Sequence, residues 1–79
     1  MTTIRVTLHD LALPENQRDH LATVFKTAVL RYCKDADRLR EWRDAHDHRF
    51  NDAKSAGLKA VRAIIGDRQP LYPYIEFLK

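Results

Sequence analysis

The segment from Pro14 to Ile65 contains no proline after its first residue and a single glycine, Gly57. Proline interrupts helices because it lacks a backbone N–H and its ring collides with the preceding turn. Within this segment the apolar residues recur at helical spacing, in three groups. These are Leu21, Val24, Phe25, Ala28 and Tyr32; Leu39, Trp42, His46, Phe50 and Ala53; and Leu58, Val61, Ile64 and Ile65. The pattern predicts two to three antiparallel helices.

The ends of these helices are predicted from capping residues. Pro14 suits the first turn of a helix, where its missing N–H needs no partner. The first break lies around Asp35 and Asp37, because either carboxylate can accept hydrogen bonds from the free N–H groups of a new helix. The second break is assigned to one of two places, Asn51–Asp52 or Gly57.

Both ends of the chain are expected to be extended. Residues Ile4–Leu8 alternate apolar and polar side chains, which is the period of a strand with one buried face. Gly66 is expected to end the last helix. The two prolines that follow are incompatible with a helix interior, and Tyr74–Leu78 is predicted to form a strand. One strand is not stable alone, so Ile4–Leu8 should pair either with this tail or with its copy in a second subunit. The predicted fold class is mainly α with a minor β element.

The length of 79 residues corresponds to one small domain, residues 1–79. A chain of this size buries only a small core, so we expect it to self-associate as a homodimer or to dock on a partner. Its 44% hydrophobic and 32% charged residues are typical of a globular chain and not of a disordered one. No apolar run approaches the roughly 18 residues of a membrane helix, and the N-terminus lacks an apolar signal region, so no membrane partner is expected.

Cys33 is the only cysteine of the chain. An intrachain disulfide and a cysteine-based zinc site are thereby excluded, and a lone cysteine suits a reducing, cytoplasmic compartment. Two interpretations of its environment are open. The positive neighbours Arg31 and Lys34 would lower the pKa of the thiol, whereas a small residue near a helix end is more often part of the core.

Two histidines stand close together in the stretch from Arg43 to Asp52. At about 100° per residue, a continuous helix turns His46 and His48 to nearly opposite sides. His46 is then expected beside Trp42, as a polar group of a small core or of an interface.

His48 is expected to face outward in line with Asp44 and Asp52, four residues away on either side. Imidazole and carboxylate groups bind transition metals, so Asp44, His48 and Asp52 form a candidate metal site. The alternative is a solvated acidic face, and it is favoured because three ligands along one helix do not close a tetrahedral site. No cofactor is expected.

The net charge of +3 is mildly basic. Arg31, Lys34 and Arg38 surround the first break and could track phosphates in a nucleic acid. Acidic residues are interleaved with the basic ones, which is more typical of a solvated surface with salt bridges.

The opening sequence TIRVTLHD, from Thr3, resembles the start of ribbon-helix-helix DNA-binding proteins. The resemblance implies a strand paired across a dimer, with Arg5, Thr7 and His9 facing the major groove. It covers only the first dozen residues. The chain then departs from the pattern, because a loop with Pro14 follows and the next helix runs on without an early turn, so the family is not assigned.

The leading prediction is a non-enzymatic protein-binding module, because no glycine-rich phosphate loop is present and Ser55, the only serine, lies in no nucleophile elbow. Aromatic residues and arginine are enriched in binding hot spots. The candidate contacts are therefore Trp42, Arg43, Tyr72, Tyr74 and Phe77, although the tail aromatics could instead cover their own core. By analogy with phage- and plasmid-encoded accessory proteins, the partner is expected to be a host or cognate protein that is inhibited or modulated.

Two alternatives stay open. One is a nucleic-acid-binding transcriptional regulator, and the other is a metal- or ligand-binding helical protein. The contacts expected for the first are Arg5, Thr7, Arg31, Lys34 and Arg38.

Overall fold

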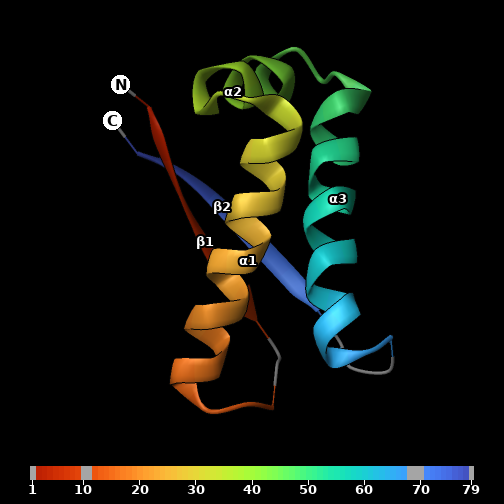
Figure 1. Cartoon of the computed structure of the whole chain (residues 1–79). Helices are drawn as coiled ribbons and strands as arrows, with labels where there is room; N and C mark the ends of the chain where they lie inside the picture. Colours follow the sequence, from red (N-terminus) through yellow and green to blue (C-terminus); the bar gives the residue numbers. More distant parts are fainter. Residues whose placement is uncertain (1, 10–11, 68–70, 79) are drawn as a thin grey trace.

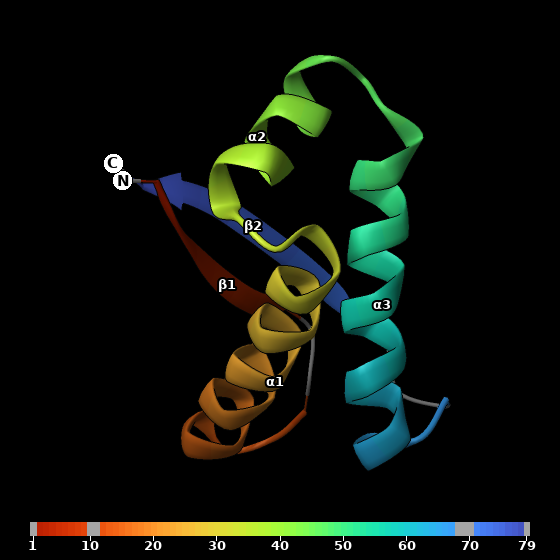
Figure 2. The same ribbon diagram turned by 45° about the horizontal axis from the view of Figure 1, so that its top comes forward.

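A computed structural model describes residues 2–9, 12–67 and 71–78 of the chain. The elements follow in the order β1 (Thr3–His9), α1 (Glu15–Cys33), α2 (Ala36–Asp44), α3 (His48–Ile65) and β2 (Tyr72–Leu78). The strands form one two-stranded sheet, and α1 and α3 run antiparallel, side by side, on one face of it (Figure 1). Figure 2 shows α2 at one end of this helix pair, which it connects. The predicted fold class, mainly α with a minor β element, is confirmed.

The two strands come from opposite ends of the chain and pair antiparallel. Thr3 lies opposite Leu78, and His9 lies opposite Tyr72. Two partners were left open for the first strand, and the structure pairs it with the C-terminal tail of the same chain. Alternate residues of β1 point into the core, as the period-two pattern predicted, and Ile4, Val6 and Leu8 are buried.

The core lies between the sheet and the helix pair. Its helical part is built from fully buried side chains of all three helices: Phe25, Val29, Cys33, Leu39, Ala53 and Val61. Gly57 faces α1 at the α1–α3 contact, and the absence of a side chain there lets the two helices approach closely.

The apolar residues of the predicted groups do lie on helices, but some of them are exposed. Tyr32 is 44% exposed and Ile64 is 57% exposed, so neither belongs to the core. Val29 and Gly57, which were in none of the predicted groups, are buried, and Ala53 is buried as predicted. Helical spacing indicates that an apolar stripe exists, but the position of the neighbouring helix decides which edge of that stripe is covered.

Two of the predicted helix ends are confirmed. Asp35 is the N-cap of α2, and its carboxylate accepts a hydrogen bond of 2.8 Å from the backbone N–H of Asp37. Gly66 ends α3 with a φ of 85°, a conformation that favours glycine. The first helix begins at Glu15, directly after Pro14.

The predicted second break is wrong. The helix that was expected to run on through His46 ends at Asp44, and His46 adopts a φ of 54°. Asp47 then caps α3, because its carboxylate accepts a 2.9 Å hydrogen bond from the N–H of Arg49. Asn51–Asp52 and Gly57, where the break was expected, both lie inside α3. No described helix is long and apolar enough to span a membrane.

Candidate protein-interaction surface

The sheet has one face turned away from the helices, which we call the outer sheet face. The residues of this face are identified from the pairing register and from the burial of Ile4, Val6 and Leu8 on the opposite side. Its members alternate along the two strands: Thr3, Arg5, Thr7 and His9 from β1, and Tyr72, Tyr74, Glu76 and Leu78 from β2. The structure thus brings together residues from opposite ends of the sequence.

Two tyrosines dominate the outer sheet face. Tyr72 is 60% exposed and Tyr74 is 57% exposed. Tyr74 lies opposite Thr7 in the sheet, and its ring meets that of His9 edge-on, with the centroids 6.4 Å apart and the planes at 61°. This contact limits the orientations of the Tyr74 ring while leaving much of its surface open, which suits a residue that binds a partner at low entropic cost.

Beside the tyrosines, Arg5 is paired across the sheet with Glu76. Its guanidinium donates hydrogen bonds of 2.8 and 2.7 Å to the two carboxylate oxygens. The hydrogen bonds and charge of Glu76 raise the pKa of the Arg5 guanidinium above its ordinary value. Arg5 was a candidate nucleic-acid contact, and its charge is balanced by Glu76 in this arrangement.

Phe77, another predicted contact, belongs to the inner side of the sheet. It lies opposite Ile4, is half-buried and packs against the core. The guanidinium carbon of Arg43, on α2, lies 4.4 Å from the centre of its ring. Arg43 and Phe77 are therefore a tertiary contact between α2 and β2 and are separate from the exposed tyrosines.

Trp42 lies in a second cluster, at the end of the helix pair. Its half-buried ring meets Tyr32 edge-on at 6.1 Å, and the guanidinium of Arg49 lies 4.8 Å from its centre. Arg49 also donates to the carboxylate of Asp47, with a shortest distance of 2.7 Å. Sequence spacing could not place Arg49 on Trp42, because the contact crosses the turn between α2 and α3.

Asp47 links this cluster to the start of α3. The hydrogen bonds from the side chain and the backbone N–H of Arg49 lower the pKa of the Asp47 carboxyl to about 2. The hydrogen bond with Asp47 in turn raises the pKa of the Arg49 guanidinium. The carboxylate therefore acts as an N-cap and as an ion-pair partner at once.

The candidate metal ligands are not brought together as expected. Asp44 ends α2, whereas His48 and Asp52 lie on α3, so the three do not share a helix face. His48 Nε2 lies 3.9 Å from Asp52 Oδ2, and His48 Nδ1 lies 3.5 Å from Asp47 Oδ1. Within residues 2–9, 12–67 and 71–78, no group of three metal-ligating side chains is assembled. His46, expected beside Trp42, is exposed in the turn instead.

Cys33 is part of the core. It is fully buried, and this burial raises the pKa of its thiol above the ordinary value. The expectation that Arg31 and Lys34 lower this pKa is wrong, because both side chains are exposed at the helix end while the sulfur faces inward. The second interpretation, a small core residue, is confirmed.

The three basic residues around the first break are all exposed: Arg31 and Lys34 at the end of α1, and Arg38 in α2. They surround a turn in which Lys34 adopts a φ of 71° and closes α1 by donating its N–H to the carbonyl of Leu30. All three residues lie at or near the α1–α2 junction, whereas Arg5 lies on β1.

Comparisons of the chain with protein-family models, with curated proteins and with solved structures give no match.

Proposed function

We propose that the chain is a small non-enzymatic protein-binding module that contacts its partner through the outer sheet face. The observation that carries the proposal is the exposure of Tyr72 and Tyr74, side by side on a sheet face that no described element covers. Tyrosine supplies a large contact area and a polar tip, and it is enriched at protein interfaces.

The remaining groups of the outer sheet face fit such a contact. Arg5 and Glu76 are already paired with one another, so burying them under a partner does not leave a lone charge. Thr7, opposite Tyr74, and Thr3, on the other side of the charged pair, add small polar side chains to this face. The partner class in the proposal is a host or cognate protein that is inhibited or modulated, as for the accessory proteins of phages and plasmids.

Affinity capture from cells that carry the gene tests this proposal. The bait is the whole chain, compared with the double variant Tyr72→Ala/Tyr74→Ala and with Tyr32→Ala, which removes an exposed tyrosine elsewhere. Nuclease treatment removes captures that depend on nucleic acid. A protein retained by the chain and by Tyr32→Ala but lost with the double variant supports the proposal. Equal retention by a folded double variant contradicts it.

A second candidate function is binding of nucleic acid, and it is favoured by three exposed cations near the α1–α2 junction, Arg31, Lys34 and Arg38. Binding through phosphates weakens steeply as salt is raised, because counterions are released. The test is fluorescence anisotropy with labelled DNA at several salt concentrations. Binding that is lost when the three residues are changed to glutamine supports this function, and the absence of binding at low salt contradicts it.

The proposal includes two further expectations, a homodimer and a cytoplasmic location. The small core favours a homodimer, which sedimentation equilibrium tests directly. The single cysteine, Cys33, is a buried free thiol, and a cytoplasmic site of action fits it. Fractionation of cells that produce the tagged chain checks that location.

A further inference from the structure

Strand β1 has a partner on only one of its edges. The sheet consists of β1 and β2, so the second edge of β1 presents its alternate backbone N–H and C=O groups to no other described strand. Unpaired groups on a regular strand are a template for another strand.

This edge lacks the features that usually protect a strand from pairing. Residues Thr3–His9 pair one to one with β2, so the strand has no bulge. It contains no proline and no lysine, and its one charged residue, Arg5, is engaged by Glu76. Strand β2, in contrast, contains Pro73. Of the two strands, β1 is therefore the better template.

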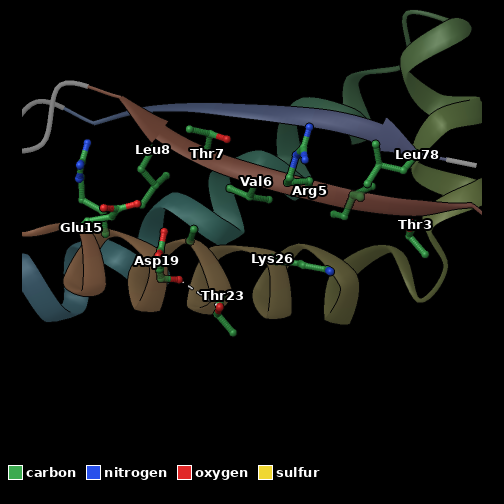
Figure 3. Close-up of a pocket in the computed structure, with 13 residues that line it drawn as sticks. Thr3, Arg5, Val6, Thr7, Leu8, Glu15, Asp19, Thr23, Lys26 and Leu78 are labelled. Carbon is green, nitrogen blue, oxygen red and sulfur yellow. Dashed lines mark hydrogen bonds between the residues drawn. The ribbon is translucent and has the colours of Figure 1, made fainter.

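A groove runs along the free edge of β1. It has a volume of about 760 Å³, and α1 forms its floor (Figure 3). Helices packed side by side lie about 8–10 Å apart, whereas paired strands lie only about 4.8 Å apart. The α1–α3 layer is thus wider than the two-stranded sheet, and the uncovered part of α1 leaves room for a strand beside β1.

The floor of the groove carries charged side chains along its length. Glu15 and Asp19 lie toward Leu8, and Lys26 lies toward Arg5 (Figure 3). The cationic Arg18 also lines the groove, so the two carboxylates exceed it by one negative charge. Ala22 and Thr23, which are small, lie between them in the sequence and line the same groove. A strand placed there could therefore come close to the helix in the middle and meet charges at both ends.

Arg18, which lines the groove, has a buried polar atom without a partner. Its Nε has no hydrogen-bond partner among the described residues, and an unsatisfied buried donor is costly. The guanidinium carries further N–H groups, which can donate to a carbonyl or carboxylate brought into the groove.

We propose that an extended segment of a partner protein adds to β1 as a third, antiparallel strand. Antiparallel pairing is the more stable arrangement per residue, and it makes the segment run from the Leu8 end of the groove toward the Thr3 end. Its groove-facing side chains are basic over Asp19 and acidic over Lys26.

The spacing of these charges can be matched by a strand. Lys26 follows Asp19 by seven positions in α1, a rise of about 10 Å. Two strand residues four positions apart face the same side and lie about 13 Å apart. The partner segment therefore needs a basic residue followed, four positions later, by an acidic one.

Peptides of the length of β1 test this directly. The first probe is the capped peptide Thr-Lys-Val-Thr-Val-Glu-Thr, and the control has the lysine and the glutamate exchanged, so both have the same composition. Titrations followed by NMR should show that the first peptide binds about tenfold more tightly than the control. Amide hydrogen exchange should slow at the alternate residues of β1 that face the free edge.

A protein variant with the groove charges reversed provides the matching control for the two peptides. In Asp19→Lys/Lys26→Asp, both substituted side chains lie on the surface of α1, and circular dichroism verifies that the helix content is kept. This variant should prefer the control peptide. A preference that does not change with the groove charges would contradict the proposal.

Three other outcomes also overturn it. They are binding of neither peptide, preference of the unchanged protein for the control peptide, and a dimer in which a second copy protects the free edge of β1. The proposed contact of the outer sheet face depends on Tyr72 and Tyr74, which do not line this groove. A double variant, Tyr72→Ala/Tyr74→Ala, that still binds the first peptide therefore separates failure of one interaction from failure of the other.

Discussion

Gly57 in α3 lies against Phe25 in α1 with no room for a side chain between them. A Cβ atom on Gly57 would come within 2.7 Å of Cδ2 of Phe25, and within 2.9 Å of Cγ2 of Val29. Both neighbours are completely buried, so neither can move aside easily. The close contact of the two long helices, and with it the shape of the core, depends on this glycine.

The variant Gly57→Ala is expected to be less stable by about 1 kcal/mol, the middle of a net range of about 0–2 kcal/mol. Alanine favours a helix by about 1 kcal/mol relative to glycine, but overpacking a core typically costs 1–3 kcal/mol. Urea unfolding measures the difference. Ser55→Ala, at an exposed position of the same helix, is the control and should stay within about 0.5 kcal/mol of the unchanged protein. Stabilisation by Gly57→Ala would contradict the described packing.

The variant His46→Gly is expected to be more stable, by about 0.5–1 kcal/mol. His46 has a positive φ, which is unfavourable for a residue with a side chain, and glycine removes that strain at some cost in unfolded-state entropy. Thermal unfolding of the variant provides the measurement. His48→Gly, inside the first turn of α3, should be destabilising. Destabilisation by His46→Gly would instead favour the continuous helix that the sequence pattern predicted.

The ion pair of Asp47 and Arg49 is expected to weaken in acid. The pKa of Asp47 is lowered from 3.8 to about 2, so the unfolded chain binds a proton more readily than the folded one. The stability contributed by this carboxylate is therefore present above about pH 4 and lost as the pH falls toward 2.

Unfolding free energies measured at several pH values check this expectation. Asp47→Asn keeps an oxygen that can cap α3 but removes the titration, so its stability should fall less over the same window. Ser55→Ala, an exposed substitution in α3 that changes no ionisable group, should leave the slope unchanged. An identical slope for Asp47→Asn and the unchanged protein would show that the pair does not contribute.

Local sequence patterns predicted the parts of the fold that depend on neighbouring residues. The alternation at Ile4–Leu8 predicted both β1 and its buried face, and the carboxylate of Asp35 predicted the start of α2. The turn at His46 was missed because this residue falls in phase with Trp42 and Phe50 in a helical pattern. A non-glycine residue with a positive φ gives no periodic signal that would reveal the break.

The candidate contacts illustrate the same limit. Tyr72 and Tyr74 share one face because they are two positions apart in a strand, which spacing alone can predict. Phe77 and Trp42 were grouped with them by residue type, yet tertiary packing turns Phe77 toward the core and places Trp42 under Arg49. The groove beside β1 combines distant elements and depends on the relative widths of two layers, so no local pattern could indicate it.

The central claim is that Tyr72 and Tyr74 bind the partner, and its most direct test is the Kd of the captured protein for three purified chains. Isothermal titration should give Tyr72→Ala/Tyr74→Ala a Kd that is weaker by at least about tenfold, because hot-spot aromatics contribute more than about 1 kcal/mol each. Tyr32→Ala should bind like the unchanged chain. A folded double variant with an unchanged Kd would contradict the account.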